Sequence, residues 1–252
     1  MYNQATHLQG VPNMANFFRP SRTIPVTTWT ATSRWDLSLP RLAILAAGLF
    51  LFGLGEAFFV QSNQGNSPWA VFASGITNIT GLSLEWATFA IGAVICLLWI
   101  PLGEKYGIGP IANTIIVAWA MGVGRSFIPL LDSQQYGLSL IYILVGISCI
   151  GFGSAFYITC GLGAGPRQGV MAALHRITGI RVSRITTAIE VVVCTLGVLM
   201  GGKIGFGTLV FAVLVGQSVA IAFGVIGRLG AVTPVASVPS DDDSAASSAV
   251  DG

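Results

Sequence analysis

The chain has very little charge for its length. Only 9% of its 252 residues are charged, whereas 53% are hydrophobic. A soluble surface normally needs about 25% charged residues, so this composition excludes an ordinary soluble domain and predicts a protein that lies in a lipid bilayer. The net charge of +2 is small, and no basic patch is interleaved with aromatic residues, which argues against a nucleic-acid partner.

Residues suited to metal binding or nucleophilic catalysis are also scarce. The sequence contains two histidines and four cysteines, and the cysteines lie within or at the ends of apolar runs without any Cys-x-x-Cys pair. We therefore interpret them as buried apolar residues and not as disulfides or metal ligands. Because His175 has no carboxylate or nucleophile near it in the sequence, we expect no metal, no cofactor and no enzymatic activity.

Long apolar runs dominate the rest of the sequence. About 20 apolar residues are needed to cross roughly 30 Å of hydrocarbon. The first run begins at Leu42, after a proline-rich polar stretch, and is interpreted as a retained anchor and not as a cleaved signal peptide. Six runs reach or approach the required length, namely residues 42–60, 84–101, 111–128, 138–159, 184–200 and 208–226.

The second half of the chain repeats the first at a shift of 98 residues. Residues 63–81 contain a glycine-bearing loop, Pro68, about a dozen mostly apolar residues and then Ile-Thr-Gly, and residues 161–179 have the same skeleton around Pro166. Other glycines coincide at the same shift, which a shared apolar composition does not explain. The sequence therefore predicts an internally duplicated protein.

Basic residues predict how the copies are oriented. With a cytoplasmic N-terminus, ten of the twelve Lys and Arg residues fall on the inner side, and only Arg125 and Lys203 fall outside, as the positive-inside rule requires. Each copy contributes three spans, so the second copy enters the membrane from the opposite side and the repeats are inverted. The linker 61–83 has no Lys or Arg, whereas its counterpart 161–184 has four.

These observations predict the fold class. We expect an all-α transmembrane protein with six spanning helices in two inverted three-helix repeats, each with a short non-spanning helix after its first span. The predicted parts are a flexible cytoplasmic tail over residues 1–40, membrane repeats over 41–130 and 131–228, and a disordered acidic tail over 229–252.

The two short helices have two placements open to them. Residues 68–79 and 166–177, as helices, are about 18 Å long and cannot cross the bilayer. Each begins with a proline at the first helical position, after glycines that leave backbone N–H groups open. As half-helices dipping into the membrane, they would direct their positive ends at an anionic or dipolar substrate in a central cavity. Lying flat, they would be interfacial connectors.

Ionisable residues inside the spans are candidates for function, because burying a charge in the membrane is costly. Glu56 lies in the first span and Glu190 in the fifth, and the other copy has Ser154 and Gly92 at these positions. One hypothesis makes either acid a proton or cation acceptor coupled to transport. The alternative is that Glu56 reaches outward or pairs with Arg125, and that Glu190 is hydrogen-bonded between helices.

A candidate substrate or ion site combines these acids with the two loops and with amides inside the spans. Asn113 and Gln217 lie in the third and sixth spans, where such amides line a cavity or join helices. The complete set of candidate residues is Glu190, Glu56, Asn113, Gln217, Gly65, Ser67, Pro68, Gly163, Gly165, Pro166, Arg167 and Gln168.

The second copy carries motifs of a known family. The run GLGAGPRQGVMAAL is followed by RITG, by TAIE ending at Glu190, and by GGKIGFGT ending at Thr208. This pattern resembles the YczE branch of the YczE/YyaS/YitT integral membrane proteins, over about residues 41–227. The resemblance implies a bacterial inner-membrane protein with no assigned substrate. The family usually reads PRDG where this chain has Gln168, which puts any acidic role at that position in doubt.

Two functions from different classes follow. The first is a small-molecule transporter or channel-like permease that works by rocking one repeat against the other. The second is a non-transporting scaffold or accessory subunit of another membrane complex. The expected partners are the lipid bilayer, a small-molecule substrate, and a membrane protein or a second copy of this chain.

Overall fold

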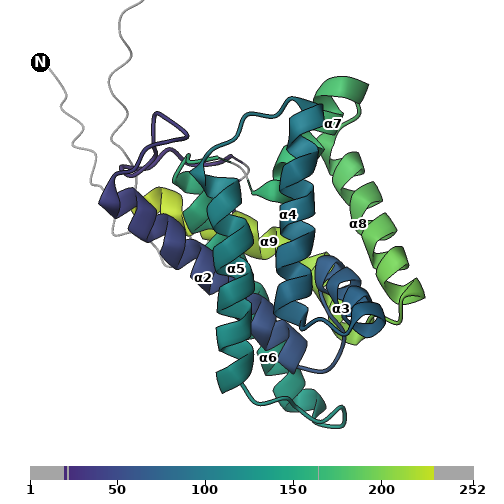
Figure 1. Ribbon diagram of the computed structural model, residues 1–252. Coiled ribbons are helices and arrows are strands. Elements are labelled where there is room, and N and C mark those ends of the chain that lie inside the picture. The colour runs from purple at the N-terminus through teal and green to yellow at the C-terminus, as the bar shows by residue number, and fades with distance from the viewer. Residues whose placement is uncertain (1–19, 22, 164, 230–252) are drawn as a thin grey trace, which may run out of the picture.

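The chain folds into a bundle of helices of two lengths. The computed structural model describes residues 20–21, 23–163 and 165–229. In the first half, a long helix is followed by a short one and two further long ones, and the second half repeats this order (Figure 1). The eight helices in this part of the chain are α2 (Leu39–Gln61), α3 (Pro68–Thr80), α4 (Leu84–Leu102), α5 (Ile108–Phe127), α6 (Tyr136–Thr159), α7 (Pro166–Thr178), α8 (Val182–Leu199) and α9 (Phe206–Leu229).

The short helices begin and end with the same signals. Pro68 and Pro166 lie in their first turns, where the missing N–H leaves no bond unmade. Gly81 and Gly179 follow their last residues with φ of 73° and 70°, a left-handed conformation that favours glycine. Each helix is therefore limited to 13 residues, which confirms the prediction of two short non-spanning helices.

Five of the described helices, α2, α4, α6, α8 and α9, are long and apolar enough to cross a membrane. Their bounds agree with the predicted runs to within three residues at each end. The remaining expected run, 111–128, forms α5, which has 20 residues but does not reach the hydropathy of the other five. Asn113 and Arg125 lie within α5 and lower its mean hydropathy.

Part of the predicted N-terminal tail lies against the helices. The Trp29 indole N–H donates to the Thr159 hydroxyl at 3.1 Å, and the Ala31 N–H donates to the Cys160 carbonyl at 2.8 Å. This segment therefore contacts the end of α6. Residues 1–19 and 22 of the predicted tail, and residues 230–252, nearly all of the predicted acidic tail, lie outside the described residues.

Helices α2 and α6 make the most extensive contact between helices. Gly48 faces Gly153, and Gly55 faces Gly146; a methyl group added at Gly55 would lie 2.7 Å from the Gly146 carbonyl oxygen. Small residues at such a crossing let two backbones approach closely. The early residue of each helix meets the late residue of the other, so α2 and α6 run antiparallel.

The short helix of each half packs on the other half. Helix α3 contacts α8, and α7 contacts α4. At the end of α3, the Asn78 amide donates to the Gly201 carbonyl after α8, and at the end of α7 the Arg176 guanidinium donates to the Leu102 carbonyl of α4. Asn78 and Arg176 occupy equivalent positions in the two halves. Figure 1 shows α3 and α7 at opposite ends of α4.

The loops before the short helices make equivalent bonds. The Gly109 N–H at the start of α5 donates to the Leu162 carbonyl at 2.9 Å, and the Gly207 N–H at the start of α9 donates to the Gln64 carbonyl at 2.7 Å. A shift of 98 residues converts each bond into the other with the halves exchanged. The contacts between the halves are therefore reciprocal.

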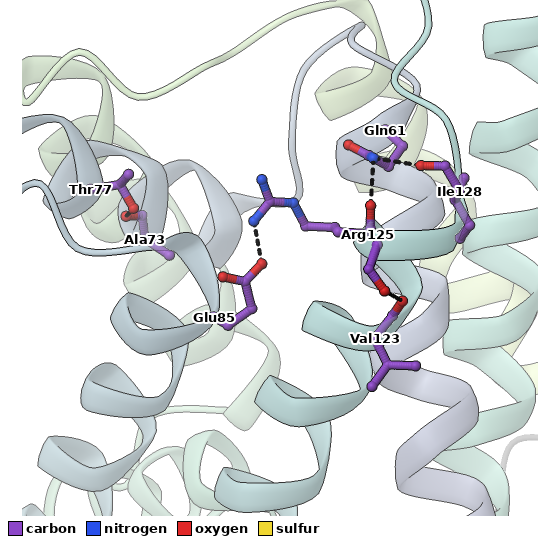
Figure 2. A network of polar contacts seen from close by, with 8 residues as sticks. Gln61, Ala73, Thr77, Glu85, Val123, Arg125 and Ile128 are labelled. Carbon is purple, nitrogen blue, oxygen red and sulfur yellow. Dashed lines mark hydrogen bonds and ion pairs between the residues drawn. The ribbon is translucent and has the colours of Figure 1, made fainter.

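An ion pair joins α4 and α5 beside α3. Figure 2 shows the Arg125 guanidinium and the Glu85 carboxylate directed at one another. The Gln61 amide, at the end of α2, donates to the Arg125 and Ile128 carbonyls. Arg125 is therefore paired with Glu85, which lies on the neighbouring helix α4. The alternative in which Arg125 pairs with Glu56 is wrong.

Candidate functional site

The first part of the site is a buried carboxylate at the start of α3. Glu56 of α2 is only 4% exposed, and its Oε2 accepts a hydrogen bond of 2.8 Å from the Ser67 hydroxyl. Ser67 also caps α3, since its Oγ accepts from the Ala70 N–H at 3.4 Å. One serine therefore positions both the helix start and the carboxylate.

The second part is a cation at the start of α7. Arg167 is the second residue of that helix, and its Cζ lies 4.6 Å from the centroid of the Trp69 ring. Trp69 is itself the second residue of α3. A guanidinium over an indole face is a favourable cation–π arrangement, and here it joins the beginnings of the two short helices.

Side chains from neighbouring helices hold the start of α7. The Trp99 indole N–H of α4 donates to the Pro166 carbonyl at 2.9 Å, and Gly169 leaves room for this indole, because an added methyl group would lie 2.0 Å from it. The Gln168 amide donates to the buried Tyr157 hydroxyl at 2.7 Å. Arg167 therefore projects from a backbone that is fixed on both sides.

Arg167, Trp69 and Glu56 line two cavities. The smaller cavity, of about 30 Å³, is completed by residues of α4 and α5. The larger cavity, of about 340 Å³, is completed by residues of α6, α8 and α9. The two linings correspond at a shift of 98 residues, and the corresponding pairs include Thr88 with Thr186, Gly92 with Glu190, and Val117 with Val215.

The ionisable side chains around Arg167 are acidic and oppose its positive charge. Removal from solvent lowers the pKa of the Arg167 guanidinium, and Glu56, Tyr157 and Glu190 act against this change. A buried cation is costly unless opposite charge compensates it; Glu56 and Glu190 act on the Arg167 charge from a distance, but neither forms an ion pair with it within 4 Å. Within the described residues, no group of three or more His, Cys, Asp or Glu side chains could hold a metal ion.

Most of the predicted site residues lie together. Glu190 lines the larger cavity, and Asn113 lines the smaller one. Gly65 and Gly163 turn the loops before the short helices with φ of 107° and 116°. Gly165 caps α7. Five of the predicted residues therefore surround or position the cavities, in addition to Ser67, Pro68, Pro166, Arg167, Gln168 and Glu56.

Gln217 lies away from the site. It is exposed on α9 and lines neither cavity. Its counterpart in the first half is Trp119, which is 62% exposed. Gln217 and Trp119 are therefore both exposed at equivalent places in the two halves. This exposure distinguishes Gln217 from the other candidate residues.

Trp69, Trp99 and Tyr157 contribute to the site, although no motif in the sequence marks them as site residues. Trp69 could have been found, because it aligns with Arg167 at the 98-residue shift. Trp99 bonds to a residue 67 positions away in the sequence and Tyr157 to one 11 positions away, and no local pattern signals either contact.

The fold and the site define a helical membrane protein with a polar centre between its two halves. The chain belongs to a family of unknown function (DUF6198), whose model matches residues 39–223. No solved structure matches the chain.

Three relatives agree with this family. An uncharacterized protein of Haemophilus influenzae is 36% identical over 82% of this chain and 94% of its own length. The uncharacterized membrane protein YczE of Bacillus subtilis is 32% identical over 73% of this chain and 82% of its own length. The uncharacterized protein YyaS of the same organism is 23% identical over 72% of this chain and 91% of its own length. The resemblance to YczE-type membrane proteins is therefore confirmed.

Proposed function

We propose that the chain is a small-molecule transporter of the bacterial inner membrane, with six spans in two inverted repeats and both termini in the cytoplasm. The observation that carries this proposal is the position of Arg167. Its side chain lines one cavity in each half of the protein and stacks on Trp69, which begins the other short helix. A charged group shared by two equivalent cavities suits a substrate that is exposed first to one side and then to the other.

The reciprocal contacts support the inversion. Two copies related by a twofold axis contact one another so that residue i meets j and j meets i. The bonds at Gly109 and Gly207 have this property, and so do the glycine contacts between α2 and α6. Both pairs fit an axis in the membrane plane, which passes between Arg167 and Trp69.

The length and neighbours of α5 support a sixth span. Helix α5 has 20 residues, about 30 Å at 1.5 Å per residue. Its counterpart α9 is among the five spans of sufficient hydropathy, and α5 packs on α2 as α9 packs on α6. The polar residue Asn113 faces the smaller cavity. A transmembrane placement of α5 therefore does not require Asn113 to contact lipid.

Transport is tested by an unbiased flux measurement. The purified full chain in liposomes is incubated with a small-metabolite extract of bacterial cells, and the washed lumen is analysed by mass spectrometry. We expect at least one metabolite to accumulate above the level in protein-free liposomes, and Arg167→Gln to abolish its accumulation. No accumulation of any metabolite would contradict the proposal.

The competing function is a scaffold that docks another membrane protein. Exposed aromatic residues such as Trp86 and Trp119 on α4 and α5 would face lipid under either function, so they do not favour docking. A partner that copurifies in fixed ratio, together with an absence of flux, would favour the scaffold over the transporter.

A further inference from the structure

The larger cavity contains polar groups that the protein itself leaves unpaired. Its Glu56 carboxylate is bonded to Ser67, and its Gln168 amide is bonded to Tyr157. In contrast, within residues 20–21, 23–163 and 165–229, neither the Arg167 guanidinium nor the Glu190 carboxylate makes a hydrogen bond or an ion pair within 4 Å. Each group can therefore accept a partner that enters the cavity.

A third unpaired group lies in the same wall. Ser154 of α6 is 6% exposed and lines the larger cavity, and its hydroxyl has no hydrogen-bond partner in the described part of the chain. Buried polar groups are normally hydrogen-bonded. A hydroxyl that lines the same cavity as an unpaired cation and an unpaired anion indicates a site for a polar ligand.

The two unpaired charges have opposite signs and do not neutralise one another directly. Arg167 lies at the positive end of α7, where the helix dipole and the open N–H groups favour an anion. Glu190 projects from α8 into the same cavity and offers a partner for a cation. A ligand that carries one negative and one positive group could pair with both residues at once.

Most of the remaining wall of the larger cavity is apolar. Phe52, Ile150, Phe211 and Val215 contribute to it. A volume of about 340 Å³ lies within the range of about 300–1,000 Å³ that is common for small-molecule sites. The ligand is therefore expected to carry, besides its two charged groups, an apolar group of modest size that contacts this wall.

The smaller cavity lacks this combination. Gly92 occupies the position of Glu190, so no carboxylate lies opposite Arg167 on that helix. Its volume of about 30 Å³ is enough for about one water molecule. In this conformation only the cavity of the second half has the room and the charges for an organic ligand.

We propose that the larger cavity binds a small zwitterion of the amino-acid type with an apolar side chain, its carboxylate on Arg167 and its ammonium group on Glu190. The identification of this ligand as cargo rests on the proposed transport function, whereas its binding does not. Ser154 is placed to donate its hydroxyl to the same ligand.

The test compares three molecules that differ only in charge. L-leucine carries both groups, 4-methylpentanoate lacks the amine, and 3-methylbutylamine lacks the carboxylate. Binding of each to the purified full chain in lipid nanodiscs is measured by calorimetry. We expect leucine to bind, and each analogue to bind roughly 10- to 150-fold more weakly, as expected when one charge-assisted hydrogen-bonded contact is lost.

Variants assign the two contacts. Arg167→Gln and Glu190→Gln should each weaken leucine binding by at least about tenfold. Arg184→Gln and Asp132→Asn, which remove the same charges at exposed positions outside the larger cavity, should change it less than twofold. Because Arg167 and Glu190 make no hydrogen bond in the described chain, the variants should elute as the unaltered protein does in size-exclusion chromatography. If a variant elutes differently, the zwitterion site is judged from the binding of leucine and its two analogues to the unaltered protein.

The outcomes separate the two proposals. Equal binding of leucine and of one single-charge analogue, or no binding of leucine, overturns the zwitterion site. Leucine binding without leucine accumulation in liposomes supports the site and contradicts leucine transport. Accumulation of metabolites that are not zwitterions supports transport and overturns the zwitterion site.

Discussion

Arg167 stacks on Trp69, the residue that occupies the same position in the other half of the chain, with 4.6 Å between its Cζ and the indole centroid. In the twofold arrangement proposed above, two equivalent residues can contact one another only near the axis that relates their halves. The proposal therefore places this contact on the axis, and the contact joins the beginnings of α3 and α7. The two residues have diverged into a cation and an aromatic ring, so the centre is attractive and not a clash of like charges.

The stacked ring should matter for the position of Arg167. Trp69→Leu removes the cation–π contact, which is worth about 0.5–2 kcal/mol, and should weaken leucine binding by roughly 2- to 30-fold. Trp69→Phe keeps an aromatic face and should have a smaller effect. Calorimetry on both variants tests this, and equal effects of Leu and Phe would show that the ring contributes bulk alone.

The glycines between α2 and α6 should be sensitive to a single methyl group. In Gly55→Ala the new Cβ would lie 2.7 Å from the Gly146 carbonyl oxygen, so the backbones must separate. Overpacking of this kind costs about 1–3 kcal/mol. Thermal unfolding followed by tryptophan fluorescence should show a lower midpoint.

Gly216→Ala is the matched control for that prediction. Gly216 lies inside α9, and a methyl group added there meets nothing within 4 Å. Its unfolding midpoint should stay unchanged or rise slightly, because alanine favours the helix over glycine. A fall as large as that of Gly55→Ala would contradict the steric account.

The ion pair in Figure 2 predicts that Glu85 and Arg125 are energetically coupled in a double-mutant cycle. Glu85→Gln leaves the Arg125 guanidinium without its carboxylate, and the Arg125 Nε already lacks a partner. We expect a loss of about 1–3 kcal/mol, most of which returns in the double variant Glu85→Gln with Arg125→Gln. Urea unfolding in detergent measures the cycle; additive losses would show that the two residues are not coupled.

The sequence was sufficient to predict the order and lengths of the helices. Pro68 and Pro166 mark the starts of the short helices, and Gly81 and Gly179 mark their ends. These are local signals, in which the residue itself dictates the allowed backbone. Hydrophobic length then located the long helices to within three residues.

The sequence was not sufficient to predict which residues meet. Helix α3 packs on α8, and α7 packs on α4, so each short helix carries its first residues to the other half. Those contacts depend on tertiary packing and on the fit of particular side chains, such as Trp99 against Gly169. Periodicity along one helix contains no information about such a fit.

The candidate residues divide in the same way. Glu56, Glu190 and Arg167 were recognisable, because charge inside an apolar protein is unusual. Their roles were not, since only the fold brings Ser67 to Glu56 and leaves Glu190 unpaired.

The central claim is that the two halves are inverted across the membrane around Arg167 and Trp69. It is tested most directly by single cysteines at Thr80 and Thr178, which are equivalent, exposed, and at the ends of α3 and α7, in a chain whose four native cysteines are replaced by serine. A membrane-impermeant maleimide is applied to vesicles of each orientation. The account predicts that Thr80→Cys reacts only from the periplasmic side and Thr178→Cys only from the cytoplasmic side. Reaction of both from the same side would contradict it.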